Sequence, residues 1–489
     1  MNPAWKIILG YVFFFGYMFL VIVVGEFFQK RYDLDKEKTR KIEHIATGIC
    51  WIVEYLTFGW TYHMFIAHAI ALGLLFIITF SGAMESVERD DLKHSYGLIY
   101  FGIANLILIG IVVFMNDAYF AYYGIAHYCL VLADGLAPII AKLFKDHNLQ
   151  LINGKSLAGT VTVFLVSALV ALVFSLVFAL HLSALLILSV ASLAAMAELF
   201  GAKGTDNLSV ALCVFGYLIL SHFGLLTSGM MFVVLFLPLI IIPSIFLKAV
   251  TPWGQTFSYL FLIGFTFFGG YKLTVLVLSL FAIAAVVSKI TTKKFLEKNT
   301  SSHEKSSRGS VQVFANSSVV FALAVAYYII QADWLLFAAF AVVVEGFADS
   351  MASDFGRLSK REPVDLLRFK RIPAGLSGGV SLVGTLSAFL GACVGAVIPL
   401  LFYQKIIPCL VIAGIAFAGT FIDSILGSGL QVRYQCATCG ALTDAETHCD
   451  TPALQSKGIR WIDNNVVNLM SGILTAVAAA LLFAFTDLL

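Results

Sequence analysis

Carboxylates interrupt the long apolar runs of this 489-residue chain. Asp134, Asp349 and Asp423 each lie within such a run, and Asp206 and Asp354 lie at the edge of one. Ionisable groups are costly inside membrane segments and usually serve a function. At a boundary between lipid and water they can hold Mg²⁺, which proteins bind through one or two carboxylates together with substrate phosphates. We therefore predict that these five aspartates are magnesium ligands and catalytic residues.

Basic and small residues accompany these carboxylates in the first half of the chain. Lys155 precedes a run of small residues, and Asn207 directly follows Asp206. Lysine and helix N-termini both bind phosphate. We assign Lys155 a catalytic role, and we predict that a helix begins after it and binds nucleotide phosphates through Ser156, Gly159 and Thr160. Asn207 would complete this site, and His44 is a candidate contact for the substrate hydroxyl or phosphate.

The second half has a similar arrangement. Lys370 and Arg371 precede a glycine-rich segment that we expect to open a helix and cradle phosphate through Gly375, Gly378 and Gly379. The competing interpretation is that these small residues only allow helices to pack closely. Asn464 and Asn465, at the start of the last apolar run, would complete this second site.

One loop carries residues typical of a metal centre. Cys436, Cys439, His448 and Cys449 supply the four nitrogen and sulfur ligands that a structural zinc site needs. The alternative interpretation is a loop with free thiols. The other cysteines are scattered through apolar runs, where a free thiol behaves as a small hydrophobic side chain.

Composition predicts the fold class. Hydrophobic residues make up 60% and charged residues 12% of the chain, whereas soluble domains contain about 25% charged residues. Apolar runs of about 20 residues recur, long enough to cross about 30 Å of hydrocarbon. A soluble helical protein is therefore excluded, and we expect an all-α, multi-pass membrane protein with about 16 transmembrane helices in two bundles. The expected spans lie near 8–28, 43–60, 63–82, 97–115, 118–140, 158–181, 183–200, 207–222, 227–248, 256–270, 273–290, 311–330, 334–351, 376–402, 406–430 and 466–487.

Basic residues alternate between the loops of this topology. Of the 31 Lys and Arg residues, only Lys6, Lys272 and Lys405 fall in the loops of one side. The positive-inside rule places the other side in the cytoplasm, and all the candidate carboxylates lie at that side. A secondary transporter binds its substrate near the bilayer midplane, so the predicted depth favours an enzyme that brings a soluble phosphate donor to a membrane-dissolved acceptor. No nucleic-acid partner is expected.

The chain divides into two halves of eight expected spans. We predict domains at 1–224 and 225–489, the second containing a polar linker at 291–310 and the cysteine-containing loop at 431–463. An Ala-Asp pair followed by a basic loop and small residues occurs in each half, at 133–160 and at 348–375. This pattern is compatible with an internal repeat and also with chance.

Residues 40–210 resemble the phytol kinase and dolichol kinase group, which is similar to the CTP-using phosphatidate cytidylyltransferases. The resemblance lies in 40–48 (RKIEHIATG), 133–137 (ADGLA), 154–160 (GKSLAGT), Glu198 and 206–210 (DNLSV). One departure is Ala133, where phytol kinases often have glycine.

Residues from about 264 to 489 resemble a second family, which contains plastid phytyl-phosphate kinase. The matching segments are 269–272, 311–316, 348–356, 369–382, 423–427, the cysteine-containing loop and 461–465. Asp354 stands where glutamate is more common in that family.

The two resemblances imply consecutive reactions in one chain, in which an isoprenoid alcohol is phosphorylated first to the monophosphate and then to the diphosphate. They imply CTP as the donor, Mg²⁺ as the cofactor, and an alkyl tail that lies among the helices. The alternatives are a CTP-dependent lipid cytidylyltransferase and a lipid-phosphate transporter.

Overall fold

The computed structural model describes residues 3–32, 36–58, 61–81, 96–144, 148–246, 250–298, 309–449, 451–486 and 488–489. The centre of the predicted polar linker therefore lies outside the described residues. The chain forms two compact units, Met1–Leu239 and Ile240–Leu489, called unit 1 and unit 2 below. We predicted the division at 224/225. The structure places it later because α11 packs against α9, where Ser192 Oγ donates to the carbonyl oxygen of Val234 at 2.8 Å.

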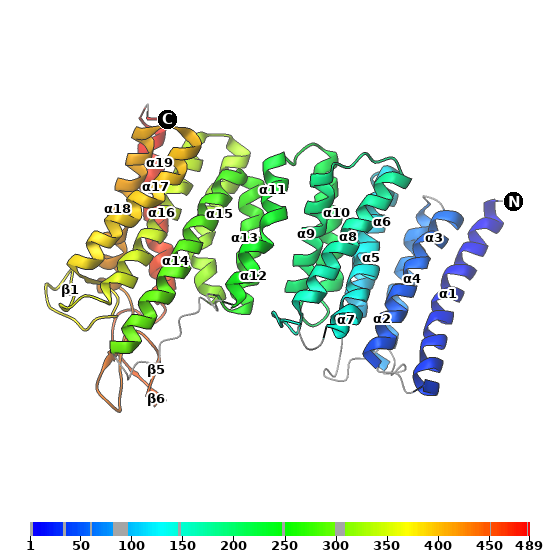
Figure 1. Cartoon of the computed structure of the whole chain (residues 1–489), viewed down its shortest axis with the longest axis horizontal. Coiled ribbons are helices and arrows are strands. Elements are labelled where there is room, and N and C mark those ends of the chain that lie inside the picture. The colour runs from blue at the N-terminus through cyan, green and yellow to red at the C-terminus, as the bar shows by residue number, and fades with distance from the viewer. Residues whose placement is uncertain are drawn as a thin grey trace. The chain divides into compact units, whose positions relative to one another are not determined.

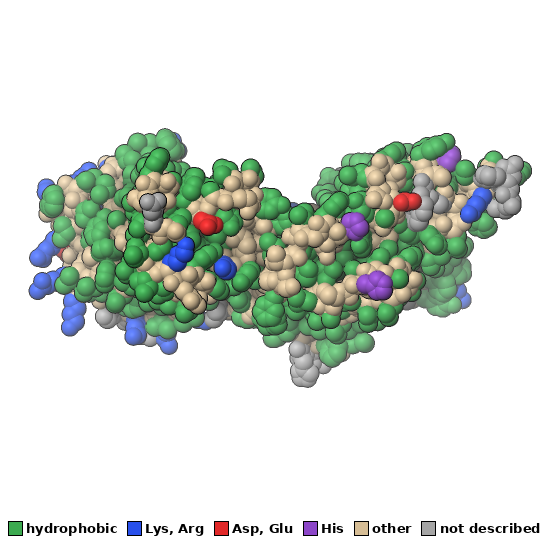
Figure 2. All heavy atoms as spheres, turned by 90° about the horizontal axis from the view of Figure 1, so that it is seen from above, with side chains coloured by type: hydrophobic (Ala, Val, Ile, Leu, Met, Phe, Trp, Pro, Cys, Tyr) green, Lys and Arg blue, Asp and Glu red, His purple; other side chains and the backbone are tan. Residues whose placement is uncertain are grey.

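Helices account for nearly all the regular structure of the described residues (Figure 1). Eleven of them are long and apolar enough to cross a membrane, and shorter apolar helices lie at Tyr62–Ile77, Ala184–Phe200 and Asp206–His222. Figure 2 looks from above onto the helix ends of Figure 1, and apolar side chains cover much of this face. The prediction of an all-α, multi-pass membrane protein is confirmed.

Unit 1 is built from helices alone among its described residues. They are α1 (Pro3–Tyr32), α2 (Lys36–Ala46), α3 (Gly48–Thr57), α4 (Tyr62–Ser81), α5 (Gly97–Phe114), η2 (Asp117–Tyr119), α6 (Phe120–Tyr128), the π-helical segment η3 (Cys129–Asp134), α7 (Gly135–Leu143), α8 (Leu157–Val177), α9 (Ala184–Phe200), α10 (Asp206–His222) and α11 (Ser228–Phe236).

The single span predicted at 43–60 is instead two short helices, α2 and α3, which meet at Thr47. The Thr47 hydroxyl donates to the carbonyl oxygen of His44 at 2.6 Å, a side-chain bond that competes with the helical ladder. Two tyrosines compensate for the break: the hydroxyls of Tyr17 and Tyr128 donate to the carbonyl oxygens of Ala46 and Gly48, each at 2.9 Å.

Unit 2 combines a helical bundle with small antiparallel strand pairs. Its elements are α12 (Pro238–Phe246, which begins at the division), α13 (Pro252–Phe268), α14 (Gly270–Lys298), α15 (Ser310–Ile330), α16 (Asp333–Gly356), β1 (Val364–Asp365), β2 (Gly379–Val380), α17 (Leu382–Tyr403), α18 (Ile406–Gly429), β3 (Arg433–Gln435), β4 (Leu442–Thr443), β5 (Thr447–His448), β6 (Thr451–Pro452), β7 (Leu454–Lys457) and α19 (Asn464–Ala484). The strand orders are β1-β2, β4-β3-β7 and β5-β6.

Helix α16 is the central element of unit 2. It packs against α14, α15, α17, α18 and α19. Its approach to α17 is close because Gly391 has no side chain: a Cβ there would lie 3.2 Å from the Cα of Ala348. This packing fixes the helix that carries two of the predicted site carboxylates, Asp349 and Asp354.

The glycine-rich segment does not open a helix, contrary to our prediction. Gly375 and Gly378 have φ angles of +96° and +80°, a left-handed backbone that favours glycine and is incompatible with an α-helix. The segment is a loop that ends in β2, and α17 begins only at Leu382, where the Ser381 side chain accepts a hydrogen bond from Gly384 N.

Candidate functional site

Lys155 lies between three carboxylates in unit 1. Its Nζ is 2.6 Å from Glu198 Oε1, 2.7 Å from Asp206 Oδ2 and 4.0 Å from Asp134 Oδ1. The loop before α8 holds the lysine in place, because the Asn153 side chain donates to the carbonyl oxygen of Phe200 at the end of α9. Four separate segments thus bring one cation and three anions together.

The π-helical segment η3 positions Asp134. Lys41 from α2 lies against it, with Nζ 2.5 Å from Oδ2 and 3.2 Å from the main-chain oxygen. Pro138 explains the second contact, because proline has no N–H to donate to the carbonyl of the residue four positions earlier. The carbonyl of Asp134 is therefore left for Lys41. His44 Nε2 completes the surroundings at 3.8 Å from Oδ2.

The charges of this cluster nearly balance: Asp134, Glu198 and Asp206 face Lys41 and Lys155, three negative groups against two positive ones. Burial alone would lower the pKa of Lys155, but the carboxylates of Asp206, Glu198 and Asp134 raise it above its ordinary value. The lysine is therefore firmly protonated.

Two buried polar atoms beside the cluster lack hydrogen-bond partners among the described residues. They are Glu198 Oε2 and the hydroxyl of Thr160. Buried polar groups are nearly always paired with protein, water or ligand. Thr160 lies in the first turn of α8, which begins as predicted: Ser156 caps the helix by accepting a hydrogen bond from Gly159 N at 3.3 Å. The role of this place in ligand binding remains a prediction.

Asn207 lies next to the cluster but is used differently from our prediction. Its side-chain amide donates to the carbonyl oxygen of Gly97 at 2.7 Å and so ties α10 to α5. Its role in nucleotide binding remains a prediction.

A polar cavity of about 490 Å³ lies in unit 2. The lining includes Glu345, Asp349 and Asp354 from different turns of α16, and Asp423 from α18. Arg357 is the single Lys or Arg among the described lining residues, and its Nη2 lies 2.7 Å from Asp354 Oδ1. Anionic groups are therefore in clear excess in this cavity.

Helix α19 contributes amides to the same cavity. The positions of the amide oxygen and nitrogen of Asn468 are assigned from its hydrogen-bonding neighbours. The nitrogen then donates to Asp423 Oδ2 at 3.2 Å and to the carbonyl oxygen of Asn464 at 3.1 Å. Asn464 lines the cavity as predicted, whereas Asn465 is not among the lining residues and donates to Asp463 Oδ2 at 2.9 Å.

The glycine-rich loop closes one side of the cavity and is held at several points. Gly375, Gly378 and Gly379 all line it. A Cβ at Gly378 would lie 2.4 Å from Ser428 N, so only glycine allows this approach of the loop to α18. Below it, Ser428 Oγ donates to Asp365 Oδ1, which also accepts from Arg368 N at 3.0 Å. The loop is thus fixed before any ligand binds.

Lys370 and Arg371, predicted to bind phosphate, are exposed and do not line the cavity. They lie on the strand-like return before the glycine-rich loop, where Asp365 N donates to the carbonyl oxygen of Lys370 at 2.8 Å. Their contact with phosphate remains a prediction, and Arg357 is the cation that the fold brings to the carboxylates.

Sequence reasoning did not assign several residues to these sites. Lys41 and Glu198 in unit 1, and Glu345, Arg357 and Asn468 in unit 2, were not predicted site residues. Lys41 lies in segment 40–48, which contributes to the resemblance of the first half to kinases, and Glu345 lies one helical turn before Asp349. A spacing of four residues places Glu345 and Asp349 on one face of a helix, and this spacing could have identified Glu345.

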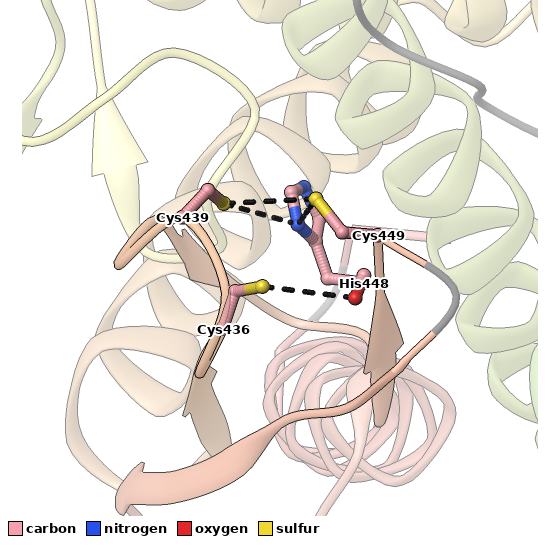
Figure 3. A group of neighbouring side chains, drawn as sticks. All are labelled: Cys436, Cys439, His448 and Cys449. Carbon is pink, nitrogen blue, oxygen red and sulfur yellow. Dashed lines mark hydrogen bonds between the residues drawn. The ribbon is translucent and has the colours of Figure 1, made fainter.

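Cys436, Cys439, His448 and Cys449 gather in the loop after β3 (Figure 3). Their ligand atoms all lie within 4.8 Å of one another, and among the described residues no other group of three or more His, Cys, Asp or Glu meets this condition. The Sγ atoms of Cys439 and Cys449 are 3.8 Å apart. A tetrahedral zinc–thiolate site with bonds of about 2.3 Å requires about this separation. The donor set fits a structural zinc ion.

The thiol of Cys436 is already prepared for metal binding. The backbone N–H of Cys439 and the imidazole of His448 lower its pKa to about 6 against the opposing effect of burial. Only the thiolate is a metal ligand, so a zinc ion would displace few protons at this residue.

The same loop reaches the polar cavity. Asp444 Oδ2 accepts hydrogen bonds from Ser377 N at 2.9 Å and from Ser377 Oγ at 2.7 Å, within the glycine-rich segment. Arg433 from β3 donates to the carbonyl oxygen of Ser377 at 2.6 Å. The cysteine-containing loop therefore holds the glycine-rich loop in place.

We expect purified protein to contain about one zinc ion per chain, because all four ligands are present. Cys439→Ser combined with Cys449→Ser should remove it, as measured by elemental analysis. Cys393→Ser, at an exposed cysteine of α17, is the control and should keep the metal. Loss of zinc should also increase hydrogen exchange in 374–381. Unchanged metal content in the double variant would contradict the zinc assignment.

Lys155→Met should destabilise unit 1 by about 3–5 kcal/mol, because it leaves buried carboxylates without their cation. A lower melting temperature in detergent measures the effect. Lys203→Met, at an exposed lysine of the next loop, is the matched control, and Lys155→Arg should restore much of the loss. Equal melting temperatures for Lys155→Met and Lys203→Met would show that the ion cluster does not stabilise the fold.

Comparison with known proteins places the second half of the chain in context. Residues 233–476 match the family described as "Integral membrane protein DUF92". An uncharacterized membrane protein of Methanocaldococcus jannaschii is 29% identical over 164 residues, which is 33% of this chain and 66% of that protein. No solved structure matches. By this similarity and by its eleven long apolar helices, the chain is a multi-pass integral membrane protein.

Proposed function

We propose that the protein is a bifunctional lipid kinase. Unit 1 would phosphorylate an isoprenoid alcohol such as phytol, geranylgeraniol or farnesol, and unit 2 would phosphorylate the monophosphate to the diphosphate, each with CTP as donor. The observation that carries the proposal is the anionic cavity of unit 2, closed by a fixed glycine-rich loop. The resemblance of each half to a kinase family supports it.

The cavity suits magnesium together with phosphate. Glu345, Asp349, Asp354 and Asp423 outnumber the single cation of the described walls, Arg357. The oxygen atoms of these carboxylates lie farther apart than the ligand atoms of the proposed zinc site. Mg²⁺ commonly binds through only one or two carboxylates, and phosphate oxygens and water supply its other ligands. When bound, the ion would neutralise the charge that develops on the transferred phosphoryl group. Asp349 and Asp423 are the residues that would hold it.

The protein's own groups would align the two phosphates. The main-chain N–H groups of the glycine-rich loop and the guanidinium of Arg357 would bind donor oxygens, while Asn464 and Asn468 fix the orientation of Asp423. Phosphoryl transfer depends mainly on such positioning and charge neutralisation. A loop that is held before binding loses little entropy when the substrate arrives.

Unit 1 would work with lysines rather than a preformed magnesium site. Asp134 and Asp206, which we predicted as metal ligands, already contact Lys41 and Lys155, so these residues leave no surplus of the kind seen in unit 2. These residues do not fit a preformed magnesium site. Lys155 would bind a donor phosphate, Thr160 would donate to it from the first turn of α8, and His44 would contact the alcohol. The active face of both units would be cytoplasmic.

A cytidylyltransferase is the first alternative, because it uses the same nucleotide and a similar site. It would transfer CMP rather than the γ-phosphate. Incubation with CTP labelled at either the α or the γ phosphorus separates the two, since only a kinase moves the γ label into lipid.

A transporter is favoured by one observation that we did not expect. Polar groups of unit 1 form a buried chain: His127 Nδ1 lies 2.8 Å from Asn105 Oδ1, which accepts from the Tyr123 hydroxyl at 3.2 Å, and His68 Nε2 lies 3.3 Å from Glu54 Oε1. Intramembrane polar groups are a feature of transport pathways. Flux of a phosphorylated lipid into proteoliposomes without nucleotide turnover would support this function.

The two activities should separate by mutation. Asp134→Asn should lower alcohol phosphorylation by about 10²-fold or more and leave monophosphate phosphorylation intact, and Asp349→Asn should do the reverse, because each removes a charge from one site only. Product analysis with radiolabelled CTP measures both steps.

The controls are aspartates at the far ends of the same helical elements. Asp117 begins the helical run that leads to Asp134, and Asp333 begins α16, which carries Asp349. The control variants are therefore Asp117→Asn and Asp333→Asn. Both variants should retain both activities. If Asp134→Asn and Asp349→Asn each abolish both steps in folded protein, two independent sites do not exist.

A further inference from the structure

A second cavity of about 160 Å³ lies in unit 2, among α12, α13, α14, α15 and α16. Most of its lining is apolar, with Leu262, Phe265, Leu280 and Phe347 among the contributing side chains. An apolar cavity of this size does not attract water strongly and can hold a hydrocarbon group.

The two cavities of unit 2 are neighbours that share part of their wall. Gln312 and Asn316 on α15, and Val342, Gly346 and Ser350 on α16, line both of them. Gly346 lies three residues before Asp349, so one helical turn separates the shared wall from a cavity carboxylate. A molecule with an anionic head in the polar cavity would therefore place its first carbon atoms in the apolar one.

Gly346 occupies the junction. A Cβ on this residue would meet no atom within 4 Å, although the residue lies in the middle of the most buried helix of the unit. Close packing of helices therefore does not require glycine here. The missing side chain instead leaves free space in the wall that the two cavities share.

The size of the apolar cavity limits what enters it. An engineered apolar cavity of about 150 Å³ holds one benzene molecule, so 160 Å³ accommodates about one five-carbon branched unit. The remainder of a long chain would extend beyond the described walls of the cavity.

We propose that this cavity binds the isoprenoid unit adjacent to the phosphate of a prenyl monophosphate, and that substrate selection in unit 2 acts on this unit rather than on total chain length. The inference rests on the proposed function of unit 2 and adds to it the part of the substrate that is recognised. Farnesyl, geranylgeranyl and phytyl monophosphates share the same first unit and should be used alike. A straight-chain alkyl monophosphate should be a poor substrate.

Gly346→Phe should block the junction. We expect monophosphate phosphorylation to fall by at least about 10-fold, since single methyl-sized misfits in apolar pockets cost about 10- to 200-fold. Preference for geranylgeranyl over the straight-chain monophosphate of equal length should fall in parallel. Gly414→Phe is the control, because a Cβ at this exposed glycine of α18 also meets no atom within 4 Å. This control should behave like the wild type.

A photoreactive probe tests the site without catalysis. Farnesyl monophosphate with a diazirine on its first unit should label residues of α13–α16 in the full-length protein, whereas a diazirine on the last unit should not. Labelling of the cavity without turnover by the wild type would sustain this inference and reject the kinase function. Labelling elsewhere, or unchanged selectivity in a Gly346→Phe variant that remains active, would overturn the inference.

Discussion

Charged groups inside an apolar bundle must find partners from other helices, and this requirement organises both units. Removing a charge from water costs several kcal/mol unless the protein compensates for it. Unit 1 meets the requirement internally. Lys155 receives contacts from three segments, and Lys41 reaches Asp134 from a fourth. Each of these contacts joins residues that are distant in sequence, so the ion cluster also fixes how the helices of the unit sit against one another.

Unit 2 meets the same requirement only in part. Glu345 accepts a hydrogen bond from the Ser471 hydroxyl at 2.8 Å, and Asp354 forms an ion pair with Arg357. Asp349 and Asp423, by contrast, face a cavity with little positive charge. Their mutual repulsion is relieved if a cation binds there. Under the proposed function, a site with excess carboxylates and a fixed glycine-rich loop would accept a cation and phosphate together, whereas the paired cluster of unit 1 would exchange one partner for another.

The positions of the helices and of the conspicuous residues could be predicted from the sequence. Apolar runs located most of the helices, the Lys155 and Ser156 segment predicted the start of α8, and the spacing of Cys436, Cys439, His448 and Cys449 predicted their cluster. The polar helix α2 was not located in this way. These features depend on local sequence or on residue types with few other uses.

The features that the sequence did not reveal depend on distant contacts or on backbone conformation. The pairing of Lys41 with Asp134 joins residues 93 positions apart, and its second contact uses a main-chain oxygen that Pro138 leaves free. The glycine-rich loop resembled a helix start because hydropathy does not report φ angles. Lys370 and Arg371 lie on the exposed return between β1 and β2 and not in the cavity wall, which their order along the chain could not reveal.

The cysteine-containing loop shows how structure outside the bundle can control a site within it. Ser377 is held by Asp444 and Arg433, both of which belong to the loop that the zinc ligands would close. The loop carries only short strands, which are marginally stable by themselves. A metal ion would supply stability directly, since metal-binding energy becomes folding energy in small motifs. The order of the glycine-rich loop, and with it the shape of the anionic cavity, would then depend on a metal bound outside the cavity itself.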